Sequence, residues 1–172
     1  MPGDLDRIRY MSVQNVMNVN VISVRASDRV LECWLKLMEH EISGAPVLND
    51  DGAFVGILST TDILKWIFER YSKADALRKA TSADGDSSAT DMESLREITS
   101  SIRAVAESQV SSLQETGRPL YSLGANDSLD RALKLMAEFG VNRLPVVKEE
   151  KVIGIITRQD IIHMLAGRSK MR

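Results

Sequence analysis

The stretch G-I-L-S-T-T-D, residues Gly56 to Asp62, returns as G-I-I-T-R-Q-D at Gly154 to Asp160. Earlier residues return as well, namely Asp28 as Asp127 and Pro46 as Pro145. The separation is 99 residues up to the proline and 98 after it, so a length change of one residue falls within 49–53. Because an internal repeat fixes the architecture and usually places sites where the repeats meet, it is the first feature to interpret.

Each repeat predicts the order β-α-β-β-α. The first repeat predicts a strand over 21–24, a helix from Val30 capped by Ser27 or Asp28, strands over 45–48 and 54–58, and a helix from about Thr60. The second repeat predicts strands over 120–123, 144–147 and 152–156, with helices over 129–136 and 161–165. A repeat of about sixty residues buries little surface alone. We therefore expect an α+β fold in which the two motifs pack as a pseudo-twofold pair.

Apolar residues at helical spacing predict the faces that each helix buries. On the first helix they are Val30, Leu31, Trp34, Leu37 and Met38, and on the second they are Ile63, Leu64, Ile67 and Phe68. In the second repeat they are Leu129, Ala132, Leu133 and Met136. Cys33 stands where the second repeat has Ala132, which predicts a small buried residue rather than a nucleophile.

The segment over 72–109 separates a first motif at 10–71 from a second at 110–168. Residues 81–91 are small, polar and acidic, as in a flexible loop. A helix capped by Thr90 or Asp91 follows, with an apolar stripe at Leu95, Ile98, Ile102, Val105 and Ala106. That stripe can either pack on its own module or form a dimer or partner surface, and the sequence leaves both open.

The overall composition excludes several classes of partner. The net charge of −2 and the pI of 5.7 argue against nucleic acid and anionic membranes as partners. A single cysteine permits neither an intramolecular disulfide nor a cysteine cluster for zinc. The first nine residues do not resemble a signal peptide. We expect a soluble cytoplasmic protein with no bound metal and no covalent cofactor.

The repeated G-h-h-S/T-x-x-D end, where h is an apolar residue, carries the chemistry. One copy alone would be a capping box that needs no ligand. Two matching copies, each at a strand-to-helix junction, favour a ligand because helix N-termini attract phosphate and a carboxylate accepts hydrogen bonds from a diol such as ribose. Asp also reaches back less well than the Glu or Gln of the best capping boxes. Arg158 can pair with phosphate, whereas Thr60 at the matching place is neutral, so the two sites should differ.

Taken together, these segments resemble the CBS motif, named after cystathionine beta-synthase, of which two form a Bateman module. The resemblance covers Ser12 to Val24, I-S-G-A-P-V at Ile42 to Val47, and both G-h-h-S/T-x-x-D ends. It implies adenine nucleotides (AMP, ADP or ATP), or sometimes S-adenosylmethionine, bound between the motifs, with the acid on the ribose. Asn142-Arg143-Leu144-Pro145 departs from the S-G-h-P pattern, which makes the Asp62 site the less certain one.

The resemblance also implies crossed sites. Asp160, Thr157 and Arg158 would share a ligand with Ile42, Ser43, Gly44 and Ala45. Asp62, Ser59 and Thr60 would share one with Val141, Asn142, Arg143 and Leu144.

Three functions remain open at this point. The first is a regulatory adenine-nucleotide sensor without catalytic activity, acting as a homodimer on an unknown effector protein in trans. The second is a structural or scaffolding module with empty sites, and an S-adenosylmethionine sensor is a further alternative. An enzyme is least favoured, because no residue set suggests a reaction and no catalytic residue can be named.

Overall fold

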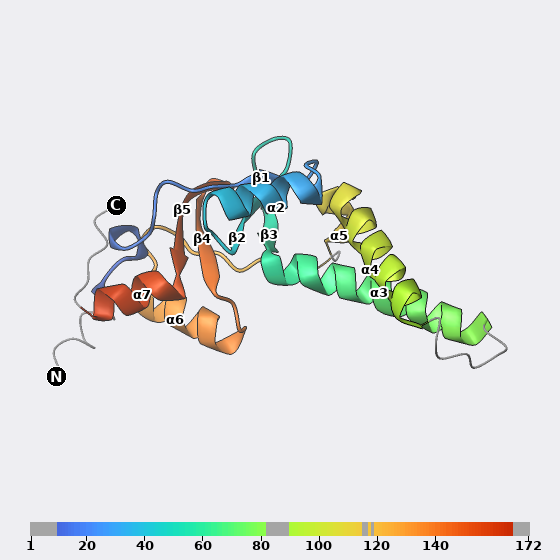
Figure 1. The fold of residues 1–172 in the computed structure, drawn as a ribbon. Coiled ribbons are helices and arrows are strands. Elements are labelled where there is room, and N and C mark those ends of the chain that lie inside the picture. Colours follow the sequence, from blue (N-terminus) through green and yellow to red (C-terminus); the bar gives the residue numbers. More distant parts are fainter. Residues whose placement is uncertain (1–9, 82–89, 115–116, 118, 167–172) are drawn as a thin grey trace. The chain divides into compact units, whose positions relative to one another are not determined.

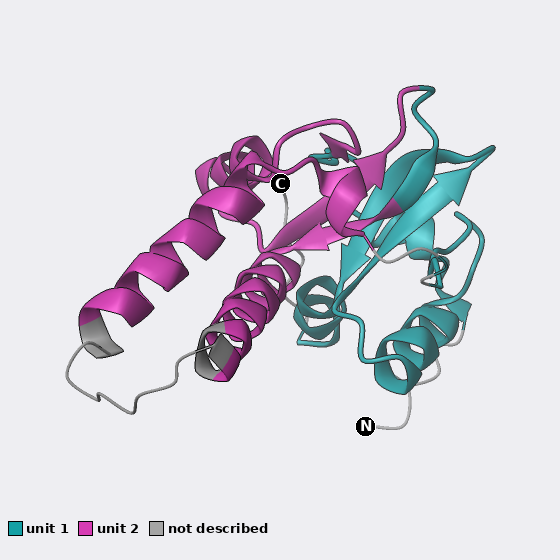
Figure 2. Ribbon diagram, turned by 90° about the vertical axis from the view of Figure 1, so that its right-hand side faces the viewer, with its two compact units in different colours: residues 1–23, 51–55, 117–172 teal, residues 24–50, 56–116 magenta. Residues whose placement is uncertain are grey.

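The computed structural model describes residues 10–81, 90–114, 117 and 119–166, without the side chains at 78, 79, 81, 90 and 91. The loop predicted over 81–91 lies mostly outside these residues. The chain divides into two compact units (Figure 2). Unit 1 comprises residues 1–23, 51–55 and 117–172, and unit 2 comprises 24–50 and 56–116. In the described part of the chain, no helix combines the length and apolarity that a membrane span requires.

Unit 2 is built around a three-stranded sheet in the order β1-β2-β3 (Figure 1). The strands are β1 (Val24–Arg25), β2 (Gly44–Leu48) and β3 (Phe54–Ser59), whose first two residues belong to unit 1. Strands β1 and β2 run parallel, with Val24 opposite Val47. The helices are α2 (Val30–Glu39), α3 (Thr60–Thr81), α4 (Thr90–Glu107) and the short α5 (Val110–Leu113).

Unit 1 pairs β4 (Arg143–Lys148) with β5 (Lys151–Thr157) in an antiparallel hairpin. Helices α6 (Leu129–Glu138) and α7 (Arg158–Leu165) and the 3-10 turn η1 (Val13–Asn15) complete it. Its core contains residues from both ends of the chain: Val13, Leu123, Leu129, Ala132, Met136, Leu144, Val146, Ile156 and Ile161. The predicted inward face of α6 is thus confirmed, with Leu133 packed against its edge.

The compact units do not coincide with the two sequence repeats. The segment that precedes the first strand of each repeat, here called its leading arm, belongs to the unit that contains the rest of the other repeat. Val13 of the first repeat is fully buried in the core of unit 1, and its N–H donates to the Asp127 carbonyl. The matching Val110 is fully buried in unit 2, where its N–H donates to the Asp28 carbonyl. Each unit therefore requires residues from distant parts of the chain.

Two predicted strands are shorter than their apolar runs. The strand expected over 21–24 is confined to Val24 and Arg25, because only these residues pair with β2. The strand expected over 120–123 is wrong: Leu120 is 53 % exposed, and Leu123 alone bridges to Val146. β-branched and aromatic residues favour extended backbone, but a strand requires a neighbour along its whole length.

The buried faces of α2 and α3 also differ from the prediction. On α2 the buried residues are Val30, Cys33 and Leu37, while Leu31 and Met38 are exposed. On α3 Ile63 is buried, but Leu64 and Phe68 are exposed. Periodicity locates an apolar stripe, but neighbouring elements decide how much of that stripe is covered.

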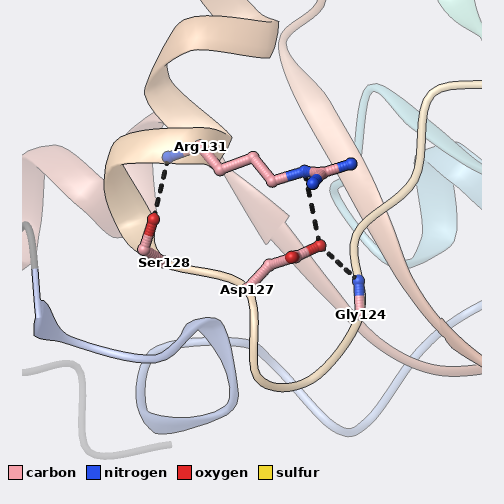
Figure 3. A network of polar contacts seen from close by, with 4 residues as sticks. All are labelled: Gly124, Asp127, Ser128 and Arg131. Atoms are coloured by element: carbon pink, nitrogen blue, oxygen red, sulfur yellow. Dashed lines mark hydrogen bonds and ion pairs between the residues drawn. The ribbon is translucent and has the colours of Figure 1, made fainter.

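The turn before each repeat's first long helix is closed by the repeated aspartate. The Asp127 carboxylate accepts the Gly124 N–H at 2.8 Å and lies 3.5 Å from the Arg131 Nε (Figure 3). In the first repeat, Asp28 accepts the Arg25 N–H at 2.8 Å. The prediction that Ser27 or Asp28 caps α2 is wrong, because the N-cap residue of this helix is Arg29.

The residues that do precede the helices differ between the repeats. Arg29 is the N-cap of α2, and Ser128 caps α6 by accepting the Arg131 N–H. The two aspartates shape the approach to the helix rather than its first turn.

Candidate functional site

The second G-h-h-S/T-x-x-D end forms a complete capping box where β5 passes into α7. The Asp160 Oδ2 accepts the Thr157 N–H at 2.8 Å and the Thr157 hydroxyl at 2.6 Å. The Asp160 N–H in turn donates to the Thr157 Oγ1 at 3.3 Å. Serine or threonine with an acid three residues later closes the first turn in this way.

The first copy has the same geometry where β3 passes into α3. The Asp62 Oδ2 accepts the Ser59 N–H at 2.9 Å and the Ser59 hydroxyl at 2.5 Å. Aspartate therefore reaches back to the N-cap N–H in both repeats, so the use of Asp in place of Glu or Gln does not by itself argue for a ligand. Each acid has a structural task that any ligand role must accommodate.

The two acids differ in their surroundings. Asp62 is only 9 % exposed and takes part in interactions beyond those of its capping box. Asp160 is half-buried, and within the described residues all contacts of its carboxylate use Oδ2. The Oδ1 atom of Asp160 is thus the better acceptor for a ligand hydroxyl, next to the positive end of the α7 dipole.

Each junction is fastened to a segment of its own repeat. The Arg158 N–H donates to the Asn142 carbonyl at 3.1 Å, and the Thr60 N–H donates to the Ser43 carbonyl at 3.1 Å. The crossed ligand sets expected from the sequence combine residues of the two units, and they stay a prediction.

The predicted adenine-contacting segments differ in exposure from residue to residue. Ser43 and Asn142 are exposed, Ile42, Val141 and Arg143 are half-buried, and Gly44 is buried. Ala45 and Leu144 are fully buried, so neither side chain forms an exposed apolar wall in this structure.

The Arg158 guanidinium reaches the end of a neighbouring helix. Its Nη2 donates to the Met136 carbonyl at 3.0 Å, near the C-terminus of α6. A cation is favourable there because the last carbonyls of a helix carry partial negative charge. A phosphate that pairs with this arginine would compete with the Met136 carbonyl.

Met17 and Gln114, which the sequence analysis did not single out, lie over the two motif glycines. A Cβ atom on Gly154 would collide with the Met17 thioether, and one on Gly56 would lie 2.6 Å from the Gln114 Nε2. The two residues follow Val13 and Val110 by four positions each, so aligning the leading arms of the repeats would have found them. They make glycine the residue that fits without displacing a neighbour.

No group of metal-ligating side chains occurs within the described ranges. Cys33 is buried as predicted, and its pKa is raised to about 12, first by burial and then by Asp28 and Glu32. A protonated buried thiol is a poor nucleophile.

Comparison with known proteins identifies the family and the fold of this chain. The CBS domain model matches residues 13–69 and 110–167, which is more than half of the chain. The chain therefore belongs to the CBS domain family, and it carries two CBS domains, which form a CBS pair or Bateman module. The expected α+β CBS-pair fold is confirmed.

An uncharacterized protein of Methanocaldococcus jannaschii is 27 % identical over 156 residues, covering 90 % of this chain and 91 % of that protein. Two solved structures show the same fold with ligands bound. CBSX2 in complex with AMP has 23 % identity and a TM-score of 0.62, covering 91 % of this chain and 96 % of that one.

The second is the CBS domain pair of a protein named MJ0100, in complex with 5-methylthioadenosine and S-adenosyl-L-methionine. It has 16 % identity and a TM-score of 0.62, covering 92 % of this chain and 98 % of that one. These ligands were observed in the related proteins. What these two structures show for the present chain is the fold of a CBS pair.

Proposed function

We propose that this CBS pair senses an adenine nucleotide, has no catalytic activity of its own, and regulates a separate protein. The observation that carries the proposal is the Asp160 junction, where one carboxylate oxygen completes the capping box and the other remains for a ribose hydroxyl. The dipole of α7 and the Arg158 guanidinium supply positive charge for phosphate within the same unit.

AMP and S-adenosylmethionine, the ligands in the two related structures, are the two kinds of ligand to compare. AMP carries a phosphate that Arg158 can pair with, whereas S-adenosylmethionine carries a sulfonium cation that Arg158 would repel. The matching Thr60 is neutral, and Asp62 is more buried than Asp160. We therefore expect the Asp160 junction to prefer AMP, ADP or ATP over S-adenosylmethionine, and the Asp62 junction to bind more weakly.

Thermal-shift titration with AMP, ADP, ATP and S-adenosylmethionine tests the proposal. A ligand that binds the native state raises the melting temperature with its concentration. A melting temperature unmoved by all four compounds would favour the scaffolding alternative.

Substitution of the acid then locates the site. Asp160→Asn keeps an oxygen for the Thr157 N–H but removes the charge, and we expect it to weaken AMP binding by about tenfold or more, since a hydrogen bond to a charged group contributes about 1.5–3 kcal/mol. Asp127→Asn is the matched control, because Asp127 also accepts a backbone N–H but lies outside the candidate set. Equal AMP affinity in wild type and Asp160→Asn, measured by calorimetry, would exclude this acid.

Arg158→Ala separates phosphate recognition from folding. We expect the variant to lose affinity for AMP while its affinity for adenosine stays nearly unchanged. Because Arg158 also donates to Met136, the melting temperature of the unliganded variant is measured in parallel. An equal loss for adenosine and AMP would assign Arg158 to packing rather than to phosphate.

A further inference from the structure

Helix α4 packs a mixed face inward and leaves the Leu95, Ile98 and Ile102 part of its apolar stripe exposed. Ser101 and Val105 are 3 % and 2 % exposed, and the half-buried Ser94, Glu97 and Ala104 lie on the same side. On the other side Leu95 is 60 % exposed, and Ile98 and Ile102 are 39 % exposed. Figure 1 shows α4 beside α3, on which its inner face packs. An amphipathic helix normally buries its apolar stripe, so this one is unsatisfied within the described chain.

The exposed stripe has the spacing of a coiled-coil seam. The exposed Met92, Leu95, Thr99 and Ile102 and the half-buried Ala106 follow one another at intervals of three and four residues, as alternating a and d positions do. The Thr99 hydroxyl donates to the Leu95 carbonyl, so its polar atom is satisfied within the helix. A shallow groove along this face is lined by Met92, Leu95, Arg96, Thr99, Ser100 and Arg103.

The charges beside the seam indicate the kind of partner. Arg96 and Arg103 are one heptad apart on the same flank, and both are exposed. Within the residues that the structure describes, neither guanidinium has an ion-pair or hydrogen-bond partner. The exposed Glu93 and Glu107 fall at the b position of the heptad, one step further from the seam than the arginines and three and four residues from Arg96 and Arg103, with which they form no ion pair within the described residues. The flank of the seam is therefore basic.

A second copy of this helix complements that flank at most in part. Antiparallel pairing would bring the two arginines of one copy against the same two arginines of the other. Parallel pairing, in which an e residue faces the g residue five positions earlier on the other copy, would place Arg96 opposite Asp91 and Arg103 opposite Ile98, so that Arg103 would have no acidic partner.

We propose that the exposed seam of α4 docks an amphipathic helix of another protein, with leucine-like residues at its a and d positions and carboxylates beside them. Such a helix would cover the apolar groove and pair with both arginines. This inference does not depend on nucleotide binding, so either proposal can fail without the other.

The test uses the whole chain and two synthetic 18-residue helical peptides with leucine at a and d. One carries glutamate at the flanking positions, and the other carries lysine. Fluorescence anisotropy of labelled peptide is expected to give at least tenfold tighter binding of the glutamate peptide, with a preference that weakens as salt is added. In Arg96→Glu with Arg103→Glu, the preference should reverse to the lysine peptide.

The control is chosen to match exposure. Leu95→Ser with Ile102→Ser should abolish binding, whereas Leu64→Ser on α3, which is 61 % exposed in the wild type, should not. Circular dichroism confirms that each variant is folded. Equal binding of the two peptides, binding of neither, or an equal loss in Leu64→Ser would overturn the proposal. A sedimentation experiment could also overturn the proposal. If the wild type self-associates and Leu95→Ser with Ile102→Ser dissociates it, the helix that covers the seam is a second copy of this chain.

Discussion

Glu41 holds a backbone conformation that glycine holds in the second repeat. Helix α2 ends in a Schellman motif: the Ile42 N–H donates to the Leu37 carbonyl at 2.9 Å, and the Glu41 N–H donates to the Met38 carbonyl at 3.1 Å. This geometry requires a left-handed residue, and Glu41 has φ 51°. Gly140, at the matching place after α6, has φ 67°. The first repeat therefore carries strain immediately before the Ile42–Ala45 segment.

We expect Glu41→Gly to stabilise the fold by about 1 kcal/mol. A left-handed conformation costs a non-glycine residue roughly 1–2 kcal/mol, and glycine returns about 0.5–1 kcal/mol of this through its greater entropy in the unfolded chain. For a chain of this length, 1 kcal/mol corresponds to about 2–4 °C in melting temperature. Gly140→Glu, the reciprocal change, should destabilise by a similar amount.

Urea unfolding followed by circular dichroism measures both variants. Glu41→Gln separates charge from conformation, because it removes the carboxylate near the C-terminus of α2 but keeps the strained φ. If Glu41→Gln stabilised as much as Glu41→Gly, the effect would come from the helix dipole. If Glu41→Gly left stability unchanged or lower in a folded protein, the reasoning from backbone strain would be refuted.

Three further predictions concern single features. Burial raises the Cys33 pKa to about 12, whereas the thiol of the unfolded chain titrates near 9.0. The wild type should therefore lose stability relative to Cys33→Ala as the pH rises above 9.0, by about 2 kcal/mol near pH 10.5. A difference in urea unfolding that stays constant with pH would contradict this prediction. The two-residue turn of the β4–β5 hairpin has φ 51° at Glu149 and 65° at Glu150, so Glu149→Asn with Glu150→Gly should stabilise by about 1 kcal/mol in the same assay, and no gain would argue against a strained turn. Gly154→Ala should cost about 1–3 kcal/mol by displacing Met17, and Met17→Ala should recover part of that loss; simple additivity in the double-mutant cycle would show that the two residues do not interact.

Features that depend on neighbours in the chain, or on the repeat, can be inferred from the amino-acid sequence alone. Both capping boxes follow from residues three apart, and the order of the helices and of every strand except the one expected over 120–123 follows from apolar periodicity between turn residues. Comparison of the repeats also identified Cys33 as buried, because alanine stands at the matching position. A capping box depends only on residues close together in the sequence. The burial of Cys33 depends only on the size of the residue at the matching position of the other repeat. Neither inference requires knowledge of distant contacts.

Which apolar surfaces are covered depends on packing between elements that are distant in the sequence. The sequence showed apolar stripes on α2, α3 and α4, but only the packed structure leaves Leu31, Leu64 and Leu95 exposed. Nor did any local pattern reveal that Val13 completes the core of unit 1 while Val110 lies buried in unit 2. Burial depends on elements that are distant in sequence, and the hydrophobic effect has no direction, so a stripe favours burial without specifying what will bury it.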